Sequence, residues 1–497
     1  MNKSLYIERL KTIIIVVLFL STVLLSYFYW NTPSFSGIKQ SVNEHFSSSV
    51  FTDGEVPDLS TFVSPKEFQI NFGNGIYTVY QDDSAHLWED FLDAYIDFTN
   101  MQNLMIEEIT EAQWRETMDM KSIQYVFDYD LPVSFFESLG AANFGQSEYF
   151  DSISAAAVSE ASLTSLFIRD DTRDKYFRII SDSDFYPLDE KISEISSSSA
   201  NQYYPIYMFL GTENYAMAPY ITEISLPVLS YTKKTAENPE NYEKDLAKTF
   251  FGDSLDFVRK LTDDSGTIIY LYGYGQKMLT IYKNGVFEYQ ENPPSDDIQL
   301  DFGSALSTAV SFIANHGSWT SYDGDELDAQ LKSVSCSTSA KMSIYRFQFM
   351  TNYNNYTIYG NQSSKIVIEV TGNQITYYSR DVSMLSPDTL SEQYPEDRKN
   401  SLITDILSNN YQRLAQLLIE KNIITPGDGN LDLFDIIVKN ISSIEAGYFS
   451  RTTDEGSEYI PSGIIEFSGF NVFFNLYTGE YLGYFNETEQ QQWNGQK

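Results

Sequence analysis

Histidines are the residues of this chain best suited to metal binding or acid–base catalysis, and it has only three of them. They are His45, His86 and His316. No two stand at the spacing of zinc ligands and no H-E-x-x-H pattern occurs, so a zinc enzyme is not expected. His316 directly precedes Gly317 at the end of an apolar helical pattern. The dipole at the end of a helix favours a charged histidine, and this is our interpretation of His316.

The usual signatures of a catalytic nucleophile or a nucleotide site are also absent from the sequence. It contains neither G-x-S-x-G nor a P-loop. Lys341 follows Thr338-Ser339-Ala340, but no K-T-G or S-D-N pattern accompanies it, and we interpret this spacing as coincidence. The chain is therefore predicted to have no catalytic residue and no cofactor.

The 69 aspartates and glutamates raise the separate question of a glycosidase or a calcium site. A glycosidase needs two facing carboxylates roughly 5–10 Å apart, which a sequence does not show. The segment 427–435, GDGNLDLFD, begins like a calcium loop. However, Leu433 stands where the loop needs Gly and Lys439 where it needs Glu, so no metal site is predicted. The other acidic clusters are interpreted as solvated loops, namely 170–174, 263–264 and 323–328.

The longest apolar stretch is Thr12–Trp30, nineteen residues without a charge or a glycine. As a helix it would measure about 28 Å, close to the hydrocarbon thickness of a bilayer. Three cations precede it: Lys3, Arg9 and Lys11. An aromatic belt ends it, made of Tyr27, Tyr29 and Trp30. The sequence predicts a single membrane span with a cytoplasmic N-terminus and the bulk of the chain outside. A cleaved signal peptide is the alternative, which the long span and its bulky end disfavour.

Within this span, small hydroxylated side chains mark one helical face. Thr22 and Ser26 are four residues apart, and Ser21 flanks them. A small-xxx-small pattern lets a second helix approach closely, so these three residues are the predicted contact with a partner helix in the membrane. The alternative is that their hydroxyls bond back to carbonyls of their own helix.

The part of the chain beyond the span is large, acidic and rich in aromatic residues. The whole chain carries a formal charge of −37, with 42% hydrophobic and 15% aromatic residues. So acidic a surface argues against nucleic acid as a partner, while the apolar content is sufficient for real cores. The lone Cys336 excludes an internal disulfide. A large secreted part without disulfides is typical of a bacterial exterior, especially that of a Gram-positive cell.

Composition and periodicity predict an α+β protein in which antiparallel sheets pack on helices. The expected segments are a cytoplasmic tail (1–11), the anchor (12–30), a tether (31–63), an N-terminal domain (64–233), a linker (234–245), a central domain (246–386) and a C-terminal domain (387–497). In the N-terminal domain, Gly73-Asn74-Gly75 predicts a hairpin turn. Ser84 is the expected N-cap of a helix reaching about Asn103, and Thr110 with Gln113 predicts a capping box.

The ends of the last two domains resemble each other. The segments 367–378 and 473–485 share Thr-Gly at a turn, then an aliphatic residue and then Tyr, at a constant offset of 107 residues. In each domain we expect a helix followed by four or five antiparallel strands. The first of these helices has Leu306, Val310 and Ile313 on one face. The shared order of elements indicates a duplication.

Several of these segments together resemble the YycH family of membrane-anchored regulators. The opening INFGNGIYTVYQDDSAHLW is similar to that family, as are the central FFGDSLDFVRKL, LYGYGQKMLTIYKNGVFEYQENP and AVSFIANHGSW. The ending, AGYFSR…YIPSGIIEF…VFFNLYTGEYLGYF, is similar to both YycH and its sister YycI. The acidic inserts and the long helical segment 398–422 depart from the family pattern.

The resemblance implies a regulator of the WalK/WalR (also called YycG/YycF) cell-wall two-component system. It implies three extracellular domains, the last two alike, and an anchor that contacts the membrane helices of a WalK-like sensor histidine kinase. A YycI-like sister regulator would be a second partner. The direction of regulation does not follow, because family members differ in it. From the residues alone, a membrane-tethered glycan-binding or glycosidase-like protein and an extracellular scaffold for secreted proteins stay open as alternatives.

Overall fold

The structure is a computed structural model that describes most of the chain after residue 58. The described residues are 59–80, 86–143, 145–196, 202–221, 224–232, 239–283, 285–295, 297–317, 319, 327–339, 342–354, 356–360, 365–381, 391–395, 399–424, 433–452 and 456–485. By its internal contacts the chain divides into residues 1–49 and 50–497, and every described residue belongs to the second unit. The predicted anchor and its flanking residues lie outside the described ranges. None of the described helices is long and apolar enough to cross a membrane.

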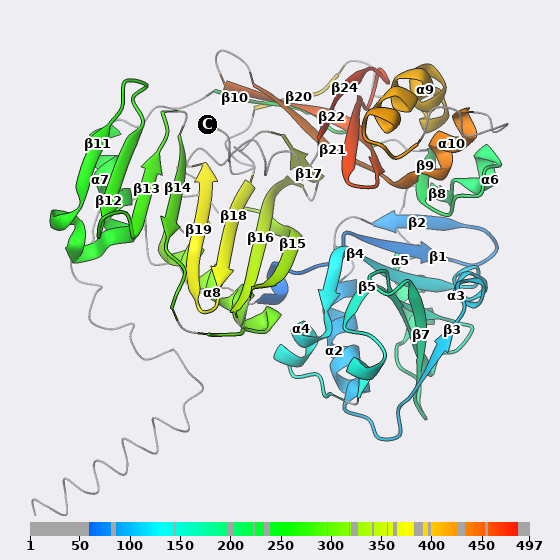
Figure 1. The fold of residues 1–497 in the computed structure, drawn as a ribbon. Coiled ribbons are helices and arrows are strands. Elements are labelled where there is room, and N and C mark those ends of the chain that lie inside the picture. The colour runs from blue at the N-terminus through cyan, green and yellow to red at the C-terminus, as the bar shows by residue number, and fades with distance from the viewer. Residues whose placement is uncertain are drawn as a thin grey trace, which may run out of the picture. The chain divides into compact units, whose positions relative to one another are not determined.

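The N-terminal part is built on a nine-stranded antiparallel sheet with the order β3-β7-β6-β5-β4-β1-β2-β8-β9 (Figure 1). Its strands are β1 (Glu67–Asn71), β2 (Tyr77–Tyr80), β3 (Met105–Ile109), β4 (Ser122–Pro132), β5 (Ser152–Ser159), β6 (Ser165–Asp170), β7 (Lys175–Ile180), β8 (Gln202–Pro205) and β9 (Met217–Ile221). The helices are α2 (Leu87–Thr99), α3 (Glu111–Met118), α4 (Val133–Ser138), α5 (Leu188–Ser196) and α6 (Tyr207–Leu210). One apolar face of α2 is buried in the core through Trp88, Phe91, Leu92, Tyr95 and Phe98.

Turn and cap chemistry explains where these elements begin and end. The β1–β2 hairpin turns at Gly73-Asn74-Gly75, and all three residues have positive φ angles of 83°, 58° and 73°, as the sequence predicts. The capping box of α3 is confirmed. The Gln113 N–H donates to Thr110 Oγ1 at 3.2 Å, and the Thr110 N–H donates to Gln113 Oε1 at 2.8 Å. The N-cap of α2 is His86, at φ 52°, rather than Ser84, which lies outside the described residues.

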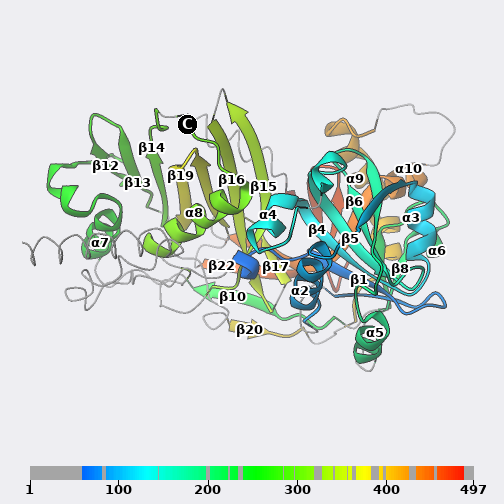
Figure 2. The ribbon, with the colours of Figure 1, turned by 90° about the horizontal axis from the view of Figure 1, so that it is seen from below.

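The central part forms a second antiparallel sheet in which β11-β12-β13-β14-β19-β18-β16 are neighbours and β15 also pairs with β16. Its strands are β11 (Arg259–Thr262), β12 (Ile268–Tyr272), β13 (Lys277–Ile281), β14 (Val286–Glu291), β15 (Ala329–Ser339), β16 (Met342–Tyr353), β18 (Lys365–Thr371) and β19 (Gln374–Asp381). Helix α8 (Phe302–Asn315) packs on β16, β18 and β19 (Figures 1 and 2). Leu306, Val310 and Ile313 of α8 are fully buried, as the sequence predicts.

The C-terminal part continues this sheet. Strand β17 (Tyr356–Tyr359) pairs in parallel with β21 (Ile441–Thr452). Beyond it, β22 (Gly456–Phe467), β23 (Phe470–Asn475) and β24 (Tyr481–Phe485) complete an antiparallel meander, and β10 (Val228–Thr232) with β20 (Ser391–Gln393) extends the sheet past β22. Helices α9 (Ile403–Glu420) and α10 (Leu433–Lys439) share a core with these strands.

The topology supports the predicted duplication. Helix α8 is followed by the antiparallel ladder β15-β16-β18-β19, and α9 with α10 is followed by β21-β22-β23-β24. The two matched turns hold glycine at positive φ, 57° at Gly372 and 68° at Gly479. A side chain would be strained at such angles, which explains the glycine in both turns.

Three sequence-based boundaries need correction. The predicted linker 234–245 contains the start of helix α7 (Pro239–Phe251). The last residues of the predicted tether belong to the core, because Phe62 and Val63 are 6% and 0% exposed. Strand β10, expected in the N-terminal domain, pairs with β22 of the C-terminal part. In the last two cases a tertiary contact decides the outcome, and local composition does not display it.

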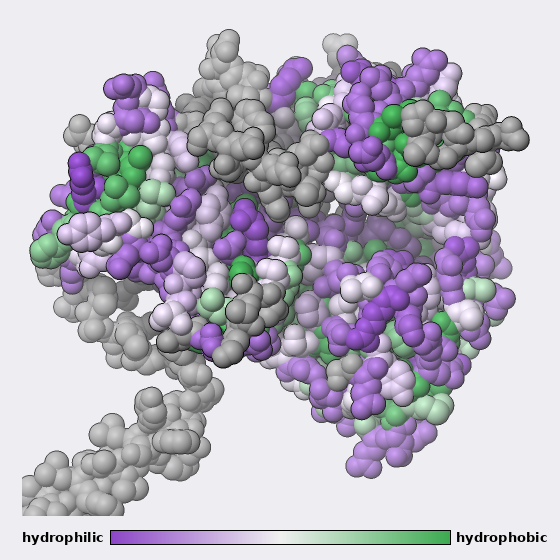
Figure 3. All heavy atoms as spheres, in the orientation of Figure 1, coloured by the Kyte–Doolittle hydropathy of each residue, from purple (hydrophilic) through white to green (hydrophobic). Residues whose placement is uncertain are grey.

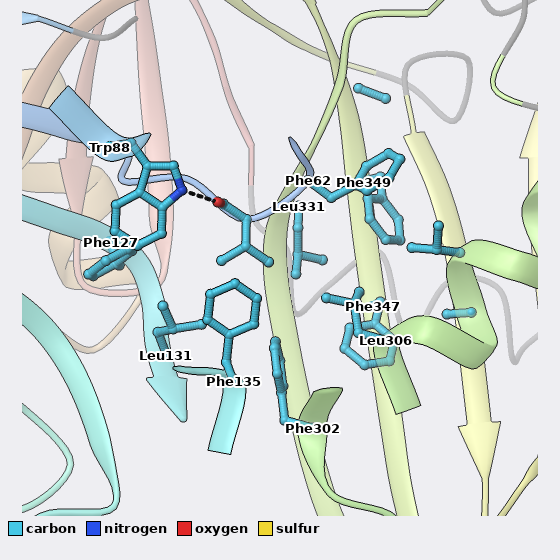
Figure 4. Packing of buried hydrophobic residues seen from close by; sticks show 14 of the residues in the cluster. Phe62, Trp88, Phe127, Leu131, Phe135, Phe302, Leu306, Leu331, Phe347 and Phe349 are labelled. Atoms are coloured by element: carbon cyan, nitrogen blue, oxygen red, sulfur yellow. Dashed lines mark hydrogen bonds between the residues drawn. The ribbon is translucent and has the colours of Figure 1, made fainter. Parts of the chain in front are cut away.

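One hydrophobic core runs through the N-terminal and central parts (Figure 4). Phe302 at the start of α8 lies edge-on to Phe135 of α4, with ring centroids 6.0 Å apart, and to Phe347 of β16 at 5.8 Å. Gly303 permits this approach, since a Cβ there would come within 2.8 Å of the Ser138 side chain at the end of α4. These two parts are therefore joined by a shared core as well as by the chain.

Candidate functional site

A cavity of about 400 Å³ lies between the first sheet and the C-terminal strands. The N-terminal part lines it with residues of β1, β4 and α3, and the C-terminal part with Ser442, Ser443 and Glu466. Figure 3 shows a hollow between these two parts, bordered mainly by hydrophilic residues. On its aromatic side Trp114 packs on Tyr176, and Arg115 lies over the Tyr215 ring at 3.8 Å. The charged lining makes this cavity the candidate functional site.

Lys66, the residue directly before β1, is the centre of an ion cluster at this cavity. Its Nζ lies 2.6 Å from Glu466 Oε2 and donates to Ser443 Oγ at 3.0 Å. Two further carboxylates lie near it, that of Glu445 at 3.8 Å and that of Asp128 at 3.9 Å. The Lys66 side chain is only 10% exposed, so its charge is stabilised by these partners rather than by water.

The same cluster reaches the central part of the chain. Lys332 on β15 lies 3.3 Å from Asp128, and Tyr359 on β17 donates its hydroxyl to Glu445 Oε1 at 2.7 Å. The cluster therefore joins all three parts of the described chain. We call the following residues the Lys66 cluster: Lys66, Glu67, Asp128, Lys332, Tyr359, Ser443, Glu445 and Glu466.

Burial and charge act in opposite directions on the pKa values of this cluster. Burial alone would lower the pKa of Lys66, but the neighbouring carboxylates, Glu445 and Glu466 foremost, raise it well above 10.5. Burial alone would raise the pKa of Glu466, yet the Lys66 ammonium and hydrogen bonds from Lys66 and Ser443 hold it below 4.5. For Glu67, burial outweighs the effect of Lys66 and raises its pKa above 4.5. Lys66 and Glu466 therefore form the charged pair of the cluster at neutral pH.

The arrangement fits a structural junction better than acid–base catalysis. The two lysines contact carboxylates from several strands, and the short contacts are ion pairs or hydrogen bonds within the protein. A glycosidase instead needs a protonated and an ionised carboxyl group facing each other across the substrate. In the described part of the chain, no group of three or more His, Cys, Asp or Glu side chains is placed to hold a metal ion.

Glu67→Gln is expected to stabilise the folded protein by about 1 kcal/mol at neutral pH. The cluster holds four carboxylates against two lysines, and Glu67 has a pKa that burial raises. Because its folded pKa lies above 4.5, keeping Glu67 ionised costs stability at neutral pH, and this cost disappears as the pH falls below 4.5. Urea unfolding of both proteins at about pH 7 and about pH 4 measures the difference. A gain of equal size at both pH values would contradict the assignment.

The two described histidines have structural surroundings. His86 is exposed at the N-cap of α2, with Nδ1 3.3 Å from Glu89. The sequence interpretation of His316 is wrong. Its ring stacks on Phe312 at 3.8 Å, and burial lowers its pKa to about 4, so it is neutral rather than charged. His45 lies outside the described residues.

The predicted contact residues of the anchor are not among the described residues, and they stay predictions. They are Ser21, Thr22 and Ser26, with the belt Tyr27, Tyr29 and Trp30 and the cations Lys3, Arg9 and Lys11. Sequence reasoning missed the Lys66 cluster, whose members are spread from residue 66 to residue 466. Lysines next to predicted strands are common, so the sequence around Lys66 contains no local signal for the Lys66 cluster.

Residues 8–194 match the family model described as "YycH protein, N-terminal domain". This N-terminal part of the chain matches the YycH family. The match covers the β1–β2 hairpin, α2 and the strands through β7, and it begins before the apolar stretch 12–30. The predicted resemblance to YycH is thus confirmed, while the YycI-like character of the C-terminal part stays a prediction. A search of curated proteins finds no match to this chain.

A solved structure shows the same fold. The crystal structure of YycH from Bacillus subtilis is similar to this chain with a TM-score of 0.53 and 13% sequence identity, covering 85% of this chain and 98% of that one. At this identity the likeness shows the fold alone. The Bacillus megaterium YpeB C-terminal domain has a TM-score of 0.24 and 12% identity, covering 51% of this chain and 99% of its own.

Proposed function

We propose that this chain is a non-enzymatic, membrane-anchored regulator of a WalK-like sensor histidine kinase. The observation that carries the proposal is the family match, which starts at residue 8 and so includes the apolar stretch 12–30. In this proposal, residues 12–30 cross the membrane of a Gram-positive cell once, with the N-terminus in the cytoplasm. The face with Ser21, Thr22 and Ser26 contacts a membrane helix of the kinase, and a YycI-like sister regulator is a further partner.

The charges of the Lys66 cluster support a regulatory role rather than an enzymatic one. Lys66 and Lys332 hold carboxylates from other parts of the chain, so these charges connect the parts. Lys66 and Ser443 hold Glu466 ionised, so this carboxylate is not a general acid at neutral pH. The extracytoplasmic part then acts as a connected body that receives a signal or a partner.

Cysteine crosslinking in the membrane of the host tests the proposed helix contact. Cys336 is exposed, so it is first replaced by Cys336→Ser and each variant carries one thiol. Thr22→Cys and Ser26→Cys lie on the predicted face, and Leu24→Cys, about 200° around the helix from Thr22, is the matched control. We expect crosslinks to the kinase from the first two variants and none from the control.

Two results would contradict the proposed contact. One is an equal crosslinking yield at all three positions, which would indicate random collision in the membrane. The other is the absence of the kinase from every crosslinked product, although the variants are present and inserted.

A further inference from the structure

Residues 59–66 lead from the predicted membrane anchor into the described part of the chain, and we call them the junction segment. The segment begins with a short 3₁₀ helix, η1 (Leu59–Thr61), and ends at Lys66, directly before β1. Phe62, Val63 and Pro65 within it are buried. A stretch whose composition indicates a tether is thus built into the core.

Phe62 attaches the junction segment to the central part. Its ring centroid lies 4.3 Å from that of Trp319 and 5.8 Å from that of Phe349. Its carbonyl accepts a hydrogen bond from the Leu331 N–H of β15 at 3.0 Å. Figure 4 shows Phe62 beside Phe349 and Leu331. Both the aromatic packing and the backbone bond would be lost if the segment moved away.

Val63 and Lys66 attach the same segment to the other two parts. The indole N–H of Trp88 on α2 donates to the Val63 carbonyl at 2.7 Å, the dashed line in Figure 4. Three residues later, Lys66 contacts Glu466 and Ser443 of the C-terminal strands. Residues 62–66 therefore contact the central, the N-terminal and the C-terminal part in turn.

We propose that the junction segment is a single mechanical unit that sets the relative placement of the three parts and couples it to the membrane-anchored chain. Its contacts are one to three residues apart, so the chain between them spans at most about 3.3–3.6 Å per residue. A shift at one contact must therefore move the next. Coupling of this kind is reciprocal. Movement of the C-terminal strands would displace the chain that leads to the anchor, and the converse also holds. The link to kinase control rests on the proposed function, whereas the coupling itself does not.

A double-mutant cycle on the full-length chain in detergent tests the coupling. Phe62→Ala removes the contact with the central part, and Glu466→Gln weakens the contact of Lys66 with the C-terminal part. We expect the factor by which Glu466→Gln raises the unfolding constant to be smaller, by about fivefold or more, in the Phe62→Ala background than in the native chain. The reason is that a segment already loosened at Phe62 has less stability to lose when the contact at Glu466 is weakened.

The matched control for the cycle is Glu458→Gln on the same strand, β22. Glu458 pairs with Arg451, whose side chain is 60% exposed, and neither belongs to the Lys66 cluster. Its effect should combine additively with that of Phe62→Ala, within about twofold. The proposal would be overturned if Glu466→Gln, combined with Phe62→Ala, deviates from additivity no more than Glu458→Gln does in the same combination. If Phe62→Ala does not fold, Phe62→Leu takes its place in the same comparison.

Kinase output in host cells separates this inference from the proposed function. Phe62→Ala, at a normal protein level, should change the output, and Phe257→Ala should not, since Phe257 is 82% exposed. If deletion of the whole chain leaves the kinase output unchanged, the proposed function fails. The double-mutant cycle still decides whether the junction segment couples the three parts. If deletion changes the output and Phe62→Ala does not, the link between the junction segment and the kinase is overturned.

Discussion

Lys66→Met is expected to lower the free energy of unfolding by about 3–5 kcal/mol. Methionine has nearly the length of lysine but lacks the charge that compensates the surrounding carboxylates. Glu445, Glu466 and Asp128 would then face one another at a site where the lysine side chain is only 10% exposed. Removing one partner of a buried ion pair is costly because the remaining charge loses its compensation. Asp128 would keep its pair with Lys332, whereas Glu445, only 9% exposed, and Glu466, 35% exposed, would lose Lys66.

Lys175→Met is the matched control for this substitution. Lys175 and Glu108 form a pair of nearly the same length, 2.7 Å against 2.6 Å for Lys66 and Glu466, but their side chains are 42% and 55% exposed. Exposed pairs of this kind contribute about 0–1 kcal/mol. Guanidinium unfolding of the full-length proteins, followed by tryptophan fluorescence, measures both effects. Equally small losses for the two variants would show that the Lys66 cluster does not hold the parts together.

The pH dependence of the Lys66 cluster follows from the same contacts. Since the folded pKa of Lys66 is raised, its contribution is fully present at neutral pH and is lost only as the pH rises above 10.5 through that pKa. Since the folded pKa of Glu466 is lowered, its contribution is present above 4.5 and is lost as the pH falls through the lowered pKa. The cluster is therefore intact over the whole neutral range.

Local elements could be predicted from the sequence because their signals are short. The hairpin turn at Gly73-Asn74-Gly75 needs residues that accept positive φ, and these stand together in the chain. The capping box of Thr110 and Gln113 also lies within one turn of a helix. The buried face of α8 appears as a three- and four-residue spacing of apolar residues.

Contacts between distant segments could not be predicted in this way. Phe62 and Val63 stand in a Ser- and Pro-containing stretch without periodicity, and only the packing of other parts around them buries them. Strand β10 pairs with β22, which comes far later in the chain. The Lys66 cluster needs strands from all three parts to be in place before its charges meet.

His316 shows how a local rule can be outweighed. The dipole of α8 favours a charged histidine at its end, an effect worth about 0.3–1 kcal/mol at exposed sites. In the structure the ring is buried against Phe312 and Phe250. Desolvation then outweighs the dipole, so that the pKa falls to about 4.

Replacing residues 12–30 by an unrelated apolar helix of the same length is expected to abolish kinase regulation completely. The proposed contact depends on one small, hydroxylated face, so membrane insertion alone does not supply it. The matched control is the same foreign helix with Ser21, Thr22 and Ser26 put back at their positions, which should restore part of the regulation. Surface levels and resistance to added protease show that the extracytoplasmic part still folds in both variants.

Kinase-dependent transcription in host cells is the measurement that tests the regulator proposal most directly. It is compared among cells with the native chain, with the replaced anchor and with the chain deleted. The proposal predicts that the replaced anchor gives the same output as the deletion. Full regulation by a chain with the unrelated anchor would contradict the proposal and assign the function to the extracytoplasmic part alone.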